Sequence, residues 1–258
     1  MRWTLRGLFG GSSGDWFDRG LDAKYLHDWP RSLRCNRRAV ELDPGNEGAW
    51  WNLGIAATAL RDWPEARRAW KRFGVEMEQG REEAGSPGQI ACVRLNPGTS
   101  GEVVWGERID PARMVLDSVP LPESGHRFRD IVLHDGAANG TREFRGGQVP
   151  VFDELIVWQQ SEYRTFRVVL EFPDPGAPDV LAAVCTEHEL GFEDWSTVRW
   201  ICAECSRGNP GAHDCTNGAT RDGTYASAAK SEADIREALA EWKARVPGAA
   251  ASEPVEAV

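Results

Sequence analysis

A sequence repeat with a period of 34 residues most strongly constrains how this chain can fold. Six residues recur at the same spacing 34 positions apart. The matched residues are Trp50 and Trp16, Gly54 and Gly20, Ala57 and Ala23, and the tripeptide Asp-Trp-Pro at 62–64 and at 28–30. In the second copy, apolar residues spaced three and four apart lie on both sides of this tripeptide, which is typical of helices. Each copy therefore predicts a helical hairpin whose apolar faces must pack against a neighbour.

The repeat resembles the tetratricopeptide repeat (TPR). A TPR unit has a bulky residue, Leu and Gly in its first helix, Ala and an aromatic residue in its second, and a closing Pro. The second copy matches this pattern at Trp50, Leu53, Gly54, Ala66 and Trp70.

The two copies depart from the family pattern at different places. The second copy has Glu78 at the closing position, whereas the first closes with Pro44 but has Arg19 and Asn36 at the Leu and aromatic positions. The resemblance covers residues 13–80 and implies a helical groove that recognises a segment of a protein partner. It implies no catalytic residues.

Charge is distributed unevenly along the 258 residues, whose net charge is −10. Residues 1–85 are close to neutral, whereas residues 86–258 carry 27 acidic and 16 basic residues. An acidic domain argues against a nucleic-acid partner, which needs clustered Lys and Arg. The arginines between Arg31 and Arg38 are interpreted as a solvated helix face. No apolar run is long enough for a membrane helix and the N-terminus does not resemble a secretory signal, so we expect a cytoplasmic protein without a membrane partner.

Residues 86–216 are predicted to form a β-rich domain. Short runs rich in β-branched and aromatic residues follow one another, separated by Gly and Pro. The runs lie at 90–95, 103–105, 114–116, 131–133, 155–158 and 166–172. Asp135-Gly136 and Gly146-Gly147 are the candidate hairpin turns. This spacing predicts a mainly antiparallel sheet that curls into a small barrel or sandwich.

A cluster of cysteine and histidine residues follows these strands and predicts a structural zinc site. Cys185 and His188 form one pair with two intervening residues, and Cys202 and Cys205 form another. Two such pairs supply four tetrahedral ligands, as in a zinc ribbon. His213 and Cys215 are an alternative to the first pair. A redox pair or plain buried thiols are the other interpretations of Cys202 and Cys205.

The β-rich domain also offers a catalytic alternative. His126, Asp130 and His134 could serve a metal- or His-dependent hydrolase or transferase, and Asp130 and His134 lie on one strand face by the period of two. The same residues also fit a hairpin edge. The sequence contains no nucleophile elbow, phosphate loop or dinucleotide fingerprint.

The chain from 217 to 258 is predicted to be a loop, a helix and a disordered tail. Ser231 and Asp234 begin the helix as a capping box, and Pro247 follows its end. The whole sequence thus predicts an α+β protein with three parts: TPR-like hairpins over 1–85, packed beside a β domain with a metal-binding knuckle over 86–216, and the C-terminal part over 217–258. We expect a protein-binding adaptor or scaffold without catalytic residues. The identity of the partner and the oligomeric state stay open.

Overall fold

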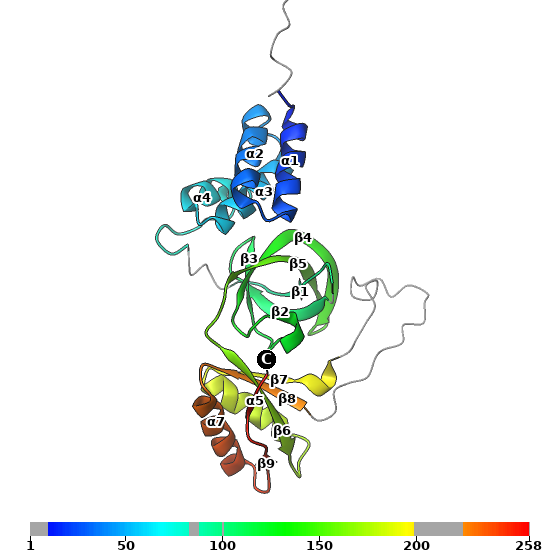
Figure 1. Ribbon diagram of the computed structural model, residues 1–258, viewed down its shortest axis with the longest axis vertical. Coiled ribbons are helices and arrows are strands. Elements are labelled where there is room, and N and C mark those ends of the chain that lie inside the picture. The colour runs from blue at the N-terminus through cyan, green and yellow to red at the C-terminus, as the bar shows by residue number, and fades with distance from the viewer. Residues whose placement is uncertain (1–9, 83–87, 100, 199–223, 258) are drawn as a thin grey trace, which may run out of the picture. The chain divides into compact units, whose positions relative to one another are not determined.

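The computed structural model describes residues 10–82, 88–99, 101–198 and 224–257 (Figure 1). The chain divides into two compact units. The first covers residues up to Pro87 together with Ile109–Ala112, and the second covers Gly88–Arg108 and Arg113–Val258. Consecutive helices in the first unit and mainly antiparallel sheets in the second give an α+β protein, as the sequence predicts.

The described part of the first unit contains four consecutive helices: α1 (Ser13–Tyr25), α2 (Trp29–Leu42), α3 (Glu47–Ala59) and α4 (Trp63–Lys71). Each begins after a side chain that accepts a hydrogen bond from a backbone amide of the first turn. These N-caps are Ser12, Asp28, Asn46 and Asp62. Such caps satisfy amides that have no partner within the helix, so they fix where each helix starts.

The 34-residue period of the sequence is also a period of the structure. The amides of Asp28 and Asp62 donate to the carbonyls of Ala23 and Ala57, both at 2.9 Å. The residue before each aspartate, His27 or Arg61, has φ of 56°. Since left-handed backbone is uncommon outside glycine, the same unusual turn in both places shows that the two hairpins close alike.

Each hairpin brings a glycine of its first helix against a side chain of its second. A Cβ added at Gly54 would lie 2.7 Å from the Trp70 ring, and one at Gly20 would lie 2.6 Å from the Asn36 amide. These two pairs are 34 residues apart. The second hairpin thus buries an aromatic ring at the position where the first buries Asn36, whose Nδ2 donates to the carbonyl of Ser32 at 2.9 Å. The glycines allow the close approach of the two helices.

Trp50 is only half-buried, although the repeat pattern predicts it in the apolar face. Its indole donates to the Pro44 carbonyl at 3.0 Å, and the guanidinium of Arg68 lies over its ring. The fully buried tryptophan of this hairpin is Trp70, whose indole donates to Thr58 Oγ1. Leu53 and Ala66 are fully buried as expected.

The second unit begins with a closed barrel of five strands in the order β1-β2-β3-β4-β5. These are β1 (Ile90–Leu95), β2 (Glu102–Arg108), β3 (Arg113–Leu116), β4 (Ile131–Phe144) and β5 (Gly147–Gln159). Neighbouring strands pair antiparallel, and parallel pairing of β1 with β5 closes the barrel. A short 3₁₀ helix, η2 (Pro122–Ser124), lies in the connection between β3 and β4. The interior of the barrel is filled by small apolar residues such as Ala91 and Val93, together with Met114 and Phe152.

The two candidate hairpin turns have different outcomes. The loop between β4 and β5 is Arg145-Gly146, with φ of 48° and 78°, so the turn lies one residue before the predicted Gly146-Gly147. Asp135-Gly136 is not a turn. It lies inside β4, where the register with β5 shifts between His134 and Ala138. The glycine here accommodates a bulge in a long strand.

The remainder of the second unit contains a five-stranded sheet with two helices on one face (Figure 1). Along the chain come β6 (Arg164–Glu171), α5 (Ala177–Glu187), β7 (Gly191–Asp194), the 3₁₀ helix η3 (Trp195–Thr197), β8 (Thr224–Ala229), α7 (Glu232–Arg245), β9 (Ala250–Ala251) and β10 (Val255–Glu256). The strand order is β10-β6-β8-β7, and β9 also pairs with β6. Without the two-residue β9, the elements follow one another as β6-α5-β7-β8-α7-β10, and β6 lies between β10 and β8. This βαββαβ order is the ferredoxin-like arrangement, and we call this part of the second unit the ferredoxin-like layer.

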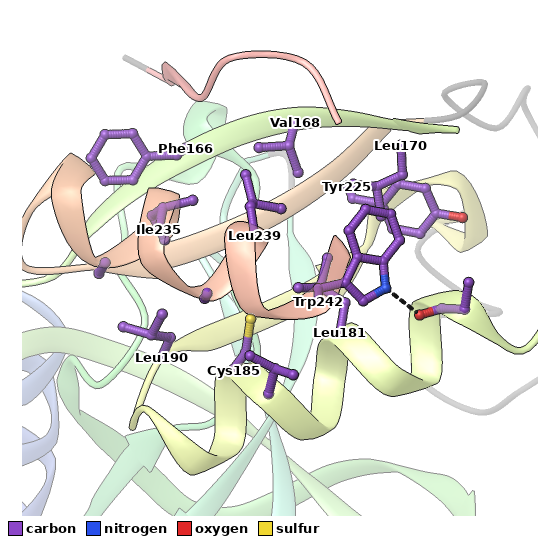
Figure 2. Packing of buried hydrophobic residues seen from close by; sticks show 14 of the residues in the cluster. Phe166, Val168, Leu170, Leu181, Cys185, Leu190, Tyr225, Ile235, Leu239 and Trp242 are labelled. Atoms are coloured by element: carbon purple, nitrogen blue, oxygen red, sulfur yellow. Dashed lines mark hydrogen bonds between the residues drawn. The ribbon is translucent and has the colours of Figure 1, made fainter. Parts of the chain in front are cut away.

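The core of this layer lies between the helices and the sheet (Figure 2). Trp242 of α7 is fully buried, and its indole donates to the Ala177 carbonyl of α5 at 2.8 Å. Leu181 and Cys185 of α5 face the same core. The capping box of Ser231 and Asp234 confirms the predicted start of α7.

The C-terminal part of the chain differs from the prediction. The tail, expected to be disordered, contributes β9 and β10, which pair with β6. The boundary predicted at 216 also separates strands of one sheet, since β8 lies between β6 and β7. Backbone pairing therefore makes residues 224–256 part of the ferredoxin-like layer.

Candidate functional site

The predicted catalytic residue His126 forms a buried ion pair with Glu154. His126 Nε2 lies 2.5 Å from Glu154 Oε1, and the side chains are 5% and 7% exposed. His126 Nδ1 faces the Ser124 carbonyl at 2.8 Å, and Glu154 Oε2 accepts from the Asn96 amide. Burial alone would lower the pKa of His126, but the hydrogen bond and charge of Glu154 outweigh it and raise the pKa. Because both ring nitrogens face acceptors, the charged imidazolium fits this place.

The predicted catalytic residue Asp130 caps backbone groups. Its carboxylate oxygens accept from the amides of Arg127 at 2.8 Å and Ser161 at 2.7 Å, and the residue is fully buried. Burial raises the pKa of Asp130 in spite of these two hydrogen bonds. The side chain therefore holds together two loops of the second unit, from the β3–β4 and β5–β6 connections.

The predicted catalytic residue His134 is fully buried in the barrel wall. Its ring stacks on Phe152 at 4.5 Å between centroids, and Nδ1 lies 3.2 Å from the Asp135 carbonyl. Within the described part of the chain, its Nε2 has no hydrogen-bond partner. Burial, reinforced by the positive charge of Arg108, lowers the pKa of His134 to about 3. This ring is neutral near pH 7 and is a poor proton acceptor.

Two further carboxylates, Glu102 and Glu193, lie in the second unit and were not singled out by the sequence analysis. Glu102 accepts from the Leu121 amide, and Glu193 accepts from the Val119 amide at 3.4 Å. Burial, aided by the charge of Glu193, raises the pKa of Glu102 to about 7 against the effect of the Leu121 amide. Burial likewise raises the pKa of Glu193 to about 7. One strand of the barrel and one strand of the ferredoxin-like layer thus both bind the segment from Val119 to Leu121.

The predicted zinc ligands fall in two groups. Cys185 lies in the apolar core of the ferredoxin-like layer, where burial raises the pKa of its thiol to about 12. His188 follows α5 and bonds to Glu241 of α7 at 2.7 Å. Cys202, Cys205, His213 and Cys215 lie outside the described residues. Within the described ranges, no three His, Cys, Asp or Glu side chains are grouped to hold a metal ion. The zinc site therefore stays a prediction.

The first unit presents a basic hollow on its first hairpin. Side chains from α1 and α2 line an open space of about 540 Å³. They are Trp16, Arg19, Arg31, Arg34, Cys35 and Arg38, which we call the arginine face. Its arginines are exposed, and the Arg19 guanidinium lies 4.9 Å from the centre of the Trp16 ring. The sequence signal for this surface is the spacing of Arg31, Arg34 and Arg38, which places them along one side of a helix.

None of the described helices is long and apolar enough to cross a membrane. No protein-family model matches the sequence, and no curated protein matches it. Among solved structures, the chain is similar to a hypothetical protein from Neisseria gonorrhoeae. The two share 16% sequence identity over 64% of this chain and 93% of that chain, with a TM-score of 0.25. A similarity of this size carries no argument about function.

Proposed function

We propose that this protein is an adaptor whose TPR-like helical unit recognises a protein partner in the cytoplasm. The observation that supports this most directly is the repetition of caps, turns and glycine contacts at a spacing of 34 residues. Units of this kind present extended surfaces built from successive helices, and such surfaces bind other proteins. The acidic second unit supports the further expectation that the partner is not a nucleic acid.

The alternative, a hydrolase or transferase, receives less support from the geometry. His126 is held by Glu154, Asp130 by two backbone amides, and His134 is buried and neutral. Each of these side chains already has a structural role. The helical unit, in contrast, displays large side chains to solvent, such as Tyr25, which is 57% exposed.

Site-specific photocrosslinking in the native host tests the adaptor proposal. A photoreactive amino acid is placed in the full-length protein at Tyr25 or Leu42 of the helical unit, and at Val169 or Val255 of the second unit as exposed controls. We expect a defined protein adduct from the helical positions. Adducts formed only at Val169 or Val255, or none at all, would contradict the proposal.

The proposal includes a structural zinc ion bound by Cys202 and Cys205 with either Cys185 and His188 or His213 and Cys215. Elemental analysis of the purified protein should find about one zinc per chain, as four such ligands hold one ion. Cys202→Ser/Cys205→Ser should remove the metal, whereas Cys35→Ala should retain it. A metal-free native protein would contradict this part of the proposal.

A further inference from the structure

We propose that the arginine face is a docking site for an acidic helix of a partner protein. This inference rests on the proposed adaptor function and names the chemistry of the partner. The site lies on α1 and α2 and consists of the hollow of about 540 Å³ between Trp16, Cys35 and the four arginines defined above. The second hairpin offers a comparison within the chain, because its equivalent face is buried at Leu53 and Ala69, although the equivalent Arg68 and Arg72 are exposed.

The equivalent face of the second hairpin indicates which kind of element can pack against the arginine face. The residues 34 positions after Arg19 and Cys35 are Leu53 and Ala69, and both are fully buried. On the same face, Glu65 of α4 bonds to Arg37 of α2, and α2 packs against α3. Arg19, in contrast, is exposed. In the repeat geometry, the neighbour that reaches the buried part of this face is therefore a helix.

The charges of the two faces are opposite at one position, whereas Arg34 and Arg38 have arginines as their counterparts. In the second hairpin, Glu65 of α4 meets the covering helix and bonds to Arg37 of α2 at 3.0 Å. The residue 34 positions earlier is Arg31. In the second hairpin, the neighbouring helix α2 supplies an arginine to Glu65. On the arginine face, a neighbouring helix has to supply a carboxylate to Arg31. Complementary charge of this kind sets which partner is accepted.

The arginines of this face are available for such a partner. Arg31 and Arg34 are exposed, and Arg19 lies over the Trp16 ring and interacts electrostatically with Asp15. Arg38 bonds to the exposed carboxylate of Glu41 at 2.9 Å. Exposed pairs of this kind are weak and exchange readily. Four arginines within one hollow of a chain with a net charge of −10 form a local positive field that attracts carboxylates.

Charge also separates this partner from other occupants. Residues 1–9 precede α1 in the chain, but they carry Arg2 and Arg6 and no carboxylate, so the arginines would repel them. A nucleic acid is disfavoured by the charge of the chain, whose residues 86–258 carry 27 acidic and 16 basic residues. A helix is the kind of element that lies against the equivalent face of the second hairpin. Acidic side chains on such a helix would complement the charge of the arginine face.

The test uses a designed probe and the full-length protein. The probe is a fluorescent, helix-stapled 14-residue peptide with the sequence of α2, in which Cys35 is replaced by Ala and its four arginines by Glu. A second peptide carries Lys at the same four positions. Binding is followed by fluorescence anisotropy at low salt. We expect the acidic peptide to bind, the basic peptide not to bind, and the affinity to fall as salt is added.

Variants of the protein locate the bound peptide. Arg31→Glu/Arg34→Glu should weaken binding of the acidic peptide about tenfold or more, since it reverses two charges at the centre of the face. The matched control is Lys71→Glu/Arg81→Glu, which makes the same charge change at exposed positions of the same unit. The control should bind as the parent does. Far-UV circular dichroism confirms that both variants keep their helices.

Several results would overturn the inference. These are absence of peptide binding, equal binding of both peptides, equal weakening in the control, and preference for a 20-nucleotide single strand over the acidic peptide. Self-association of the parent that Arg31→Glu/Arg34→Glu abolishes, measured by sedimentation, would assign the face to a second copy instead. If the peptide fails while crosslinks still form at Tyr25 or Leu42, the inference is wrong and the adaptor proposal stands.

Discussion

The buried pair of His126 and Glu154 is the residue-scale feature with the clearest energetic consequence. His126→Ala leaves the Glu154 carboxylate buried without its charged partner, and breaking a buried pair in this way costs about 3 kcal/mol or more. We expect a loss of that size in the free energy of unfolding, measured by urea denaturation at pH 6. The raised pKa of His126 means that the pair stabilises fully below the unfolded value near 6.5 and less as pH rises through the folded value.

The double variant His126→Ala/Glu154→Gln is the control for this prediction. The neutral amide can still accept from the Asn96 amide but leaves no buried charge. The double variant should therefore unfold at a higher urea concentration than His126→Ala alone. If the two variants are equally destabilised, the pair is not coupled as its geometry indicates.

The two tryptophans of the second hairpin should differ in their contribution to stability. Trp70→Ala removes a fully buried ring and should cost about 3–5 kcal/mol of the free energy of unfolding. Trp50→Ala removes a half-buried ring with its contact to Arg68 and should cost about 1 kcal/mol. Urea denaturation followed by far-UV circular dichroism measures both. Equal losses would contradict the burial seen here.

The ranking of these tryptophans could not be predicted from the repeat pattern. Periodicity places Trp50 and Trp70 each on an apolar face, but it does not say how far a neighbouring helix covers that face. The exposure of Arg19 likewise could not be predicted from the repeat pattern. The repeat pattern identifies Arg19 only as an exception at a Leu position, and the structure adds that Arg19 is exposed while its counterpart Leu53 is fully buried.

At the scale of elements, the approach of α3 to α4 depends on Gly54. A Cβ at this position would lie 2.7–2.8 Å from three atoms of the Trp70 ring, which its hydrogen bond to Thr58 holds in place. We expect Gly54→Ala to lower the free energy of unfolding by about 1–3 kcal/mol, the range typical of overpacking. Thermal unfolding followed by circular dichroism measures the effect.

Gly14 of α1 is the matched control for Gly54. It also lies in a helix, but a Cβ there would meet only Ser12 Oγ, at 3.6 Å. Gly14→Ala should therefore be neutral or stabilise by about 0.5–1 kcal/mol, because alanine favours the helix. A similar loss of stability in both variants would show that close helix contact is not the reason for the glycine at 54.

The elements predicted from the sequence are those with strong local signals. The strands from 90 to 172 have β-branched residues at close spacing, and α7 has both a capping box and a regular apolar stripe. α5 was not predicted, because its first residue follows Gly176 without a side-chain cap. β8, which is TYASAA, has small residues in place of β-branched ones, so its position in the sheet depends on pairing with β6 and β7.

At the scale of the whole second unit, the barrel and the ferredoxin-like layer share one segment of backbone. The indole of Trp195 donates to the Val119 carbonyl at 3.0 Å, and Val119, Leu121 and Phe128 pack with Ala226 and Ala228. Glu102 and Glu193 bind amides of the same segment. No local pattern predicts this arrangement, because the residues that meet are far apart in the sequence.

This shared segment predicts how stability changes with pH. Burial raises the pKa values of Glu102 and Glu193 to about 7, above the value near 4.5 of an unfolded glutamate. The folded state therefore binds protons more tightly than the unfolded state does. The contribution of the two groups is fully present below about pH 4.5 and is lost as pH rises through about 7. We expect the second unit to lose stability between pH 5 and pH 8 on their account.

Comparison with Glu102→Gln/Glu193→Gln isolates this contribution. The amides can still accept from Leu121 and Val119 but do not titrate in this range. The free energy of unfolding of the parent, relative to this variant, should fall between pH 5 and pH 8. His134, with a lowered pKa, has the opposite dependence, but it is present in both proteins and cancels. A constant difference across this range would mean that neither carboxyl group titrates near pH 7, and hence that the segment from Val119 to Leu121 does not hold them away from water.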